Sequence, residues 1–181
     1  VEKTILNLDG DPNDPFAIFD DVKQFWENVN ENKIKNAQKR KAEQAEWEKK
    51  NPELAKKLAQ FLSGKIPADI DFASIEQKPN VATRVASRTV LGYFAEHIEN
   101  MICSSADLSN SDNTDGFLKK TQDITKDDFS GKFLEAGVAE LTMASIMNGI
   151  VLHGGLFTAC GTFFVFSEYM KPAMRMSALM E

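Results

Sequence analysis

The most informative hydrophobic pattern of the chain lies between residues 133 and 169. Residues 141–152 carry no charge and are mostly apolar, and a helix that is hydrophobic all round is typically buried. One ionisable residue, Glu140, stands at the first turn of this helix, where the helix dipole favours a carboxylate. Short apolar runs at 133–136 and 157–162 predict a strand on either side of the helix.

Three aromatic residues follow the second of these strands: Phe163, Phe166 and Tyr169. Their spacing of three places the rings on one face of a helix, predicted over 165–180, or of its entry turn. A carboxylate beside an aromatic wall would suit a flat nitrogen heterocycle. The pattern alone leaves a structural interpretation open, in which Glu140 serves only the helix dipole and the rings are core residues. Phe164 is expected to be such a core residue.

The same alternation of helix and strand begins earlier in the chain. Asn80 is a predicted N-cap for a helix reaching Ile98, and residues 101–103 form a short apolar strand. The polar stretch 107–128 is predicted to be a long surface loop. Alternating strands and helices predict an α/β fold, with a mostly parallel sheet and helices on both faces.

The first third of the chain has a helical pattern of a different kind. It predicts a short helix over 20–30, a charged helix over 33–50 and a third helix over 52–62 with one apolar stripe. A Pro-containing loop over 66–78 follows these helices.

This change of pattern predicts two parts. Residues 1–79 would form a helical interdomain linker, and residues 80–181 an α/β domain. An open α/β sheet is expected to continue after the last helix, so we expect this domain to be truncated at its C-terminus and the chain to be a fragment of a longer enzyme.

Composition and charge exclude several classes of function. The 181 residues are 43% hydrophobic and 27% charged, with a net charge of −6, which is typical of a soluble globular protein and disfavours a general nucleic-acid or membrane-surface role. A basic nucleic-acid arm at 33–41 is disfavoured because acidic residues follow it at once. No signal peptide, transit peptide or membrane span is visible, and Cys103 and Cys160 are expected to be free thiols in a reducing cytoplasm.

A metal site is not predicted. Residues 9–20 resemble a calcium loop in their acidic residues, but Asp14 stands where that loop requires glycine, so a plain turn is expected. His97 and His153 are too far apart in the sequence to make a case for a metal.

Beyond these patterns, the chain resembles the pyrimidine-binding domain of transketolases, and most of all those of the Bacteroides type. The matching segments are Gly137-Val138-Ala139-Glu140-Leu141, Ile146 to Ile150, His153-Gly154-Gly155, Gly161-Thr162-Phe163, Phe166, Tyr169, Ala173, Arg175, Ala178-Leu179, Ala82-Thr83-Arg84 and Ser105-Ala106-Asp107-Leu108. Ala139 and Leu141 depart from the family, which commonly has Arg and His there.

The resemblance implies a thiamine diphosphate site. In the family, the residue matching Glu140 hydrogen-bonds ring nitrogen N1′ of the cofactor and favours the imino tautomer that deprotonates the thiazolium C2. This role requires the acid to be shielded from water. Phe163, Phe166 and Tyr169 would form the pyrimidine pocket, with Asp107 near the cofactor.

The resemblance also implies substrates and partners. Arg84 and Ser111 would hold the phosphate of a sugar. The whole enzyme would be a homodimer of the pentose phosphate pathway that moves a two-carbon ketol unit between ketose and aldose phosphates, with Mg²⁺ bound by a domain absent from this chain. The fragment alone is expected to be inactive. The alternatives are a deoxyxylulose-phosphate synthase, a dehydrogenase component, or a non-catalytic module that retains the fold.

Overall fold

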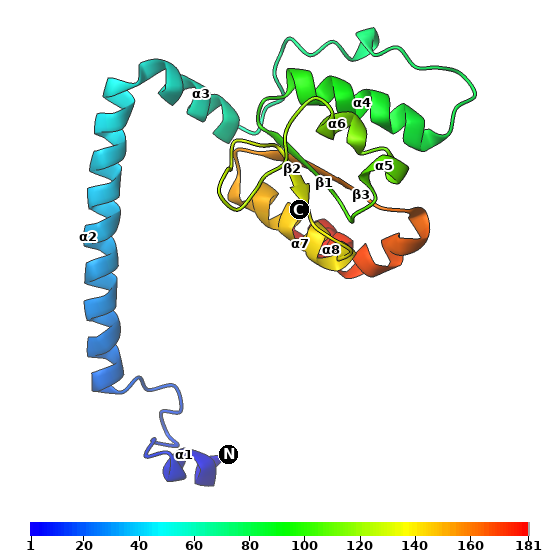
Figure 1. Ribbon diagram of the computed structural model, residues 1–181. Coiled ribbons are helices and arrows are strands. Elements are labelled where there is room, and N and C mark those ends of the chain that lie inside the picture. The colour runs from blue at the N-terminus through cyan, green and yellow to red at the C-terminus, as the bar shows by residue number, and fades with distance from the viewer. Residues whose placement is uncertain (181) are drawn as a thin grey trace. The chain divides into compact units, whose positions relative to one another are not determined.

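The computed structural model describes residues 1–180 (Figure 1). The chain divides after Ala55 into two compact units, which are described separately. In chain order the elements are α1 (Glu2–Asn7), α2 (Asp20–Lys50), α3 (Pro52–Leu62), the 3₁₀ helix η1 (Phe72–Ser74), α4 (Thr83–His97), β1 (Met101–Ser105), α5 (Ser109–Asp112), α6 (Asp115–Leu118), β2 (Phe133–Glu135), α7 (Glu140–His153), β3 (Phe157–Gly161), the 3₁₀ helix η2 (Phe164–Phe166) and α8 (Ser167–Met180).

The first unit is dominated by the long helix α2. The prediction of two helices with a break near residue 31 is wrong, because α2 runs without interruption from Asp20 to Lys50. No Gly or Pro occurs within it, and the ion pair of Glu31 with Lys35 at 3.8 Å spans the expected break. Lys39 and Glu43, also four positions apart, form a second ion pair at 3.9 Å. None of residues 1–55 is buried within this structure.

The second unit is built on a three-stranded parallel sheet with β1 in the middle, in the order β2-β1-β3. Cys103 of β1 pairs with Phe133 of β2 on one side and with Ala159 of β3 on the other. Parallel strands bring their carboxyl ends to the same edge of a sheet. The ends of β1, β2 and β3 therefore open toward the turns that lead into α5, α7 and η2.

Helices cover both faces of this sheet, which confirms the predicted fold class. Figure 1 shows α4 and α6 on one face and α7 and α8 on the other. Between α4, α6 and the sheet lies an apolar core of Ala95, Ile98, Met101, Cys103, Phe117 and Phe133. On the opposite side the buried residues are Met143, Ala144 and Met147 of α7, together with Ala173 of α8. Residues of α4, α6 and α7 thus bury apolar side chains toward the sheet, and α8 packs on α7.

The beginning of α4 differs from the prediction. Asn80 does not cap the helix: its backbone is left-handed, with φ +57°, and the N-cap position belongs to Ala82. Asn tolerates this conformation better than most residues, because its short polar side chain can hydrogen-bond locally. Asn80 therefore turns the chain two residues before the cap.

The stretch 107–128 is only partly the surface loop that its polar composition predicted. It contains α5 and α6, and Phe117 of α6 is fully buried. Gly116 allows α6 to lie directly on α4, since a Cβ there would come within 2.3 Å of the Arg88 carbonyl oxygen. Arg88 also pairs with Asp115 of α6 at 3.0 Å. Long-range packing therefore orders a segment whose composition is typical of a loop.

None of the helices within residues 1–180 combines the length and the apolar character that crossing a membrane would require.

Candidate functional site

Glu140 is the first residue of α7 and is only 7% exposed. Within residues 1–180 its carboxylate has one hydrogen-bond partner, the hydroxyl of Thr162, which donates to Oε1 across 3.4 Å. The other oxygen, Oε2, has no partner there, yet it is not sealed from solvent, since the only fully enclosed unpaired side-chain oxygen is Oδ1 of Asp115. A buried carboxylate with an open acceptor is suited to receive a hydrogen bond from a ligand.

That carboxylate lines a cavity of about 520 Å³. The other lining residues are mostly apolar or aromatic: Ala106, Leu108, Val138, Ala139, Leu141, Thr142, Phe166 and Tyr169. A mostly apolar pocket with one well-placed polar group is typical of a small-molecule site. The volume and the composition both fit a flat heterocycle.

The three predicted aromatic residues form a continuous row. The ring centres of Phe163 and Phe166 lie 6.2 Å apart with their planes inclined by 24°, and those of Phe166 and Tyr169 lie 6.4 Å apart at 22°. Phe166 and Tyr169 line the Glu140 cavity, whereas Phe163 lines the neighbouring one. Phe164 is 94% exposed, so its prediction as a core residue is wrong. Phe164 instead borders the neighbouring cavity, next to Phe163.

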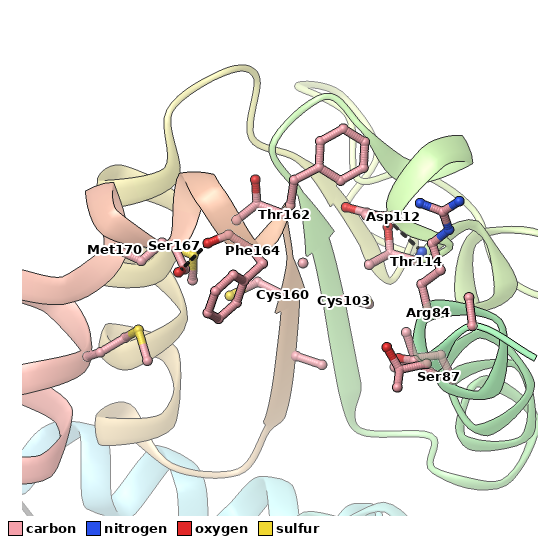
Figure 2. Close-up of a pocket in the computed structure, with 17 residues that line it drawn as sticks. Arg84, Ser87, Cys103, Asp112, Thr114, Cys160, Thr162, Phe164, Ser167 and Met170 are labelled. Atoms are coloured by element: carbon pink, nitrogen blue, oxygen red, sulfur yellow. Dashed lines mark hydrogen bonds between the residues drawn. The ribbon is translucent and has the colours of Figure 1, made fainter.

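The neighbouring cavity, about 780 Å³, borders Cys103 in the middle of β1 and residues 159–161 at the end of β3. Figure 2 shows Arg84 and Ser87 of α4 on one side of it and Ser167 and Met170 of α8 on the other. Arg84 is the second residue of α4, is exposed, and has no ion-pair partner within the described residues. The structure therefore offers a free guanidinium at the rim of an open cavity.

Asp107 and Ser111 line neither cavity. Both are exposed. Asp107 has a left-handed backbone, with φ +62°, directly after Ala106, which does line the Glu140 cavity. Ser111 lies in α5 and its hydroxyl donates to Oδ1 of Asn110 across 3.1 Å. The fold thus places Phe166 and Tyr169 at the same cavity as Glu140, whereas Asp107 and Ser111 lie outside it.

One residue that lines the Arg84 cavity was not predicted from the sequence. Asp112 lies at the end of α5 and lines the Arg84 cavity. Its Oδ2 accepts the hydroxyl proton of Ser105, and its Oδ1 accepts the amide and hydroxyl protons of Thr114, all at 2.8 Å. An Asp whose side chain accepts the amide of the residue two positions later is a common turn motif. The Asp-Asn-Thr sequence could have indicated it.

Burial sets the acid–base properties of three other groups near the sheet. It raises the pKa of the Cys103 thiol to about 12 and also raises that of Cys160. Burial, followed by the charges of Asp123, Asp107 and Asp112, raises the pKa of Glu135. Both cysteines are free thiols, as predicted. Within residues 1–180, no three His, Cys, Asp or Glu side chains are arranged to hold a metal ion.

Several known proteins have sequences similar to this chain. The chain is 38% identical over 185 residues to a chloroplastic transketolase of Craterostigma plantagineum, in a match that covers 100% of this chain and 35% of that protein. It is 40% identical over 154 residues to the transketolase of Bacillus subtilis, covering 84% of this chain and 23% of that protein. The chain thus spans about a quarter to a third of the length of these relatives.

Solved structures share the fold. A Pichia stipitis transketolase mutant superimposes with a TM-score of 0.81 at 34% identity, covering 98% of this chain and 27% of that one. A complex of the Pichia stipitis transketolase with sedoheptulose-7-phosphate also gives 0.81, at 33% identity, covering 99% of this chain and 28% of that one.

A family profile described as "Transketolase, pyrimidine binding domain" matches residues 79–181, and this match includes α4, the sheet, Glu140 and the aromatic row. The chain belongs to the family of transketolase pyrimidine-binding domains.

Proposed function

We propose that this chain is the part of a transketolase that binds the aminopyrimidine ring of thiamine diphosphate. The observation that carries the proposal is the buried Glu140 carboxylate, whose Oε2 is open in an apolar cavity walled by Phe166 and Tyr169. The family match supports this assignment. Residues 1–79 would then act as the linker and residues 80–181 as the pyrimidine-binding domain.

Glu140 would hold a proton at one ring nitrogen of the pyrimidine. Its position suits this role because a buried carboxylate beside a mostly apolar cavity forms a stronger hydrogen bond than one in bulk solvent. Thr162 would keep the carboxylate oriented through its hydroxyl. When bound, thiamine diphosphate supplies the nucleophilic carbon that adds to a ketose carbonyl.

The aromatic row would bind the flat ring. Phe166 and Tyr169 would contact it directly, and Phe163 would support Phe166 through their near-parallel packing. Asp107 would approach the cofactor from the end of β1. The diphosphate and Mg²⁺ are assigned to a part of the protein outside these residues.

Arg84 would bind the phosphate of the sugar substrate, with Ser111 as a second donor. A guanidinium without an ion-pair partner at the rim of a cavity is well suited to a phosphate, because its forked donors match the phosphate oxygens. Pichia stipitis transketolase structures contain sedoheptulose-7-phosphate and xylulose-5-phosphate. Sugar phosphates are therefore the proposed substrates, in a cytoplasmic homodimer that transfers a two-carbon ketol unit.

The test uses the full-length protein that contains these residues. A coupled assay with xylulose 5-phosphate and ribose 5-phosphate should show ketol transfer, and Glu140→Ala should remove it. Glu168→Ala, which changes an exposed acid of α8, is the matched control and should be fully active. Activity with pyruvate and glyceraldehyde 3-phosphate instead would indicate a deoxyxylulose-phosphate synthase, and activity on a 2-oxo acid a dehydrogenase component. Unchanged turnover in Glu140→Ala would indicate a module without a catalytic role.

A further inference from the structure

Asp112 connects the end of β1, next to the Glu140 cavity, with the segment before α6. Its carboxylate accepts three hydrogen bonds at 2.8 Å, one from Ser105 at the end of β1 and two from Thr114 before α6. Ser105 is fully buried and Thr114 is 4% exposed. Both oxygens of Asp112 are therefore occupied by donors that have little access to water, so their loss could not be replaced cheaply by solvent.

The first consequence concerns the turn after β1. The hydroxyl of Ser105, held by Asp112, itself accepts the amide proton of Leu108 across 3.1 Å. These two bonds close the chain around Asp107, whose left-handed backbone non-glycine residues rarely adopt. Ala106 and Leu108, on either side of Asp107, line the Glu140 cavity. Asp112 thus fixes one wall of that cavity through Ser105.

The second consequence concerns the end of β3. A Cβ on Gly161 would lie 3.1 Å from Oδ2 of Asp112 and 2.5 Å from Cγ2 of Thr114, so the last residue of β3 packs directly on the Asp112 turn. The next residue, Thr162, is the hydrogen-bond partner of Glu140. The amide of Ala106 also donates to the Gly161 carbonyl across 3.3 Å. Movement of the Asp112 turn would therefore displace Thr162.

We propose that Asp112 is a positioning residue that holds the Ala106–Leu108 wall and the Gly161–Thr162 segment in register around Glu140. It does not itself line the Glu140 cavity. This inference rests on the proposed function for its effect on thiamine diphosphate. Its structural part concerns only residues of this chain.

The test compares Asp112→Ala with Asp112→Asn in the full-length protein. Alanine removes all three acceptor contacts. Asparagine can keep them in altered form, because its amide oxygen can accept from Thr114 and its NH₂ can donate to the Ser105 hydroxyl oxygen. If Asp112 acts by geometry, asparagine should rescue the function. If its charge contacts the substrate, asparagine should fail like alanine.

Two readouts are needed. Calorimetric titration of the protein with thiamine diphosphate and Mg²⁺ should give a Kd raised roughly 10- to 100-fold in Asp112→Ala and within about threefold of wild type in Asp112→Asn. Amide hydrogen exchange, measured without cofactor, should become faster at residues 105–108 and 161–163 in Asp112→Ala and return toward wild type in Asp112→Asn.

The outcomes separate this inference from the proposed function. Unchanged exchange at both segments in Asp112→Ala would overturn the positioning role, whatever the protein binds. Faster exchange in Asp112→Ala, together with a wild-type protein that binds no thiamine diphosphate, would keep the structural part and refute the proposed function. Failure of Asp112→Asn to restore the Kd would also overturn the inference. If Asp112→Ala does not fold, Ser105→Ala and Thr114→Val replace it, because each removes one side-chain bond to Asp112. Wild-type exchange and wild-type Kd in both variants would refute the inference.

Discussion

The hydroxyl of Thr162 lies 3.4 Å from Oε1 of Glu140 and donates a long hydrogen bond to it. This distance exceeds the usual separation of hydroxyl and carboxylate oxygens, so the contact orients the acid without satisfying it fully. The carboxylate keeps most of its capacity to accept a hydrogen bond from a ligand in the cavity.

Loss of this hydroxyl should therefore matter much less than loss of the acid. Thr162→Val should lower kcat by roughly 2- to 13-fold, which corresponds to about 0.5–1.5 kcal/mol for one ordinary hydrogen bond. Glu140→Gln should lower it by on the order of 10²- to 10⁴-fold, as expected for a group that positions a proton in the reaction. Steady-state ketol-transfer kinetics of the full-length variants measure both. Equal losses would contradict this division of roles.

Phe166 should contribute to cofactor affinity through its ring. Phe166→Leu keeps an apolar side chain but removes the flat face, which should weaken thiamine diphosphate binding by about 0.5–1.5 kcal/mol, or roughly 2- to 13-fold in Kd. Phe164→Leu is the matched control, because Phe164 is two positions away, 94% exposed and outside the Glu140 cavity. Titration of both variants with the cofactor tests this, and the same Kd in both would argue against ring stacking.

Arg84 should discriminate phosphorylated from unphosphorylated sugars. Arg84→Ala should raise the KM for xylulose 5-phosphate by about 10- to 150-fold, since a hydrogen bond to a charged group contributes about 1.5–3 kcal/mol. The KM for unphosphorylated xylulose should hardly change. Arg84→Lys should show an intermediate effect, because it keeps the charge but loses the fork. A parallel rise in KM for both sugars would place the phosphate elsewhere.

Two glycines should respond in opposite directions to the same substitution. Gly116→Ala should destabilise the fold by about 1–3 kcal/mol, because its Cβ would lie 2.3 Å from the Arg88 carbonyl oxygen. Gly149 lies within α7, and a Cβ there would meet no atom outside its own stretch of helix within 4 Å. Gly149→Ala should therefore stabilise the fold by about 0.5–1 kcal/mol. Denaturant unfolding of both variants measures the difference. Similar effects at the two sites would show that α6 does not lie on α4 as described.

The two thiols should react at different rates in the native protein. The alkylating species is the thiolate, and burial raises the pKa of Cys103 to about 12 and leaves this thiol fully enclosed. Cys160 is only partly buried and lines a cavity of about 410 Å³ between β3, α7 and α8. Mass spectrometry after iodoacetamide treatment should find Cys160 modified well before Cys103, and equal rates in denaturant.

The raised pKa of Cys103 also predicts that the free energy of unfolding depends on pH. The unfolded chain loses the Cys103 proton near pH 9, whereas the folded chain keeps it until about pH 12, so the folded state binds more protons in between. This contribution to stability is present below pH 9 and is lost as the pH rises toward 12. Cys103→Ala should reduce the fall in unfolding free energy over that range, and an unchanged slope would contradict the assignment.

Local sequence patterns were sufficient where the secondary structure of a segment depends on its own residues. The apolar run after Glu140 predicted α7, and the short β-type runs predicted all three strands within about two residues. They failed where contacts between distant residues determine whether a segment is ordered and buried. Phe117 is buried because Gly116 lets α6 approach α4, a contact that no property of the polar stretch 107–128 indicates. Asp112 was missed because its partner Ser105 becomes adjacent only when the chain turns back after β1.

The sequence by itself determined the α/β fold, the position of one carboxylate at the start of an apolar helix and the row of three rings, since these depend on periodicity and spacing along the chain. Tertiary structure alone decided that Phe166 and Tyr169 share a cavity with Glu140, that Phe163 and Arg84 line another, and that Asp112 joins the ends of β1 and β3. Parallel strands separated by many residues place their carboxyl ends side by side, and the residues that follow those ends meet only through that pairing.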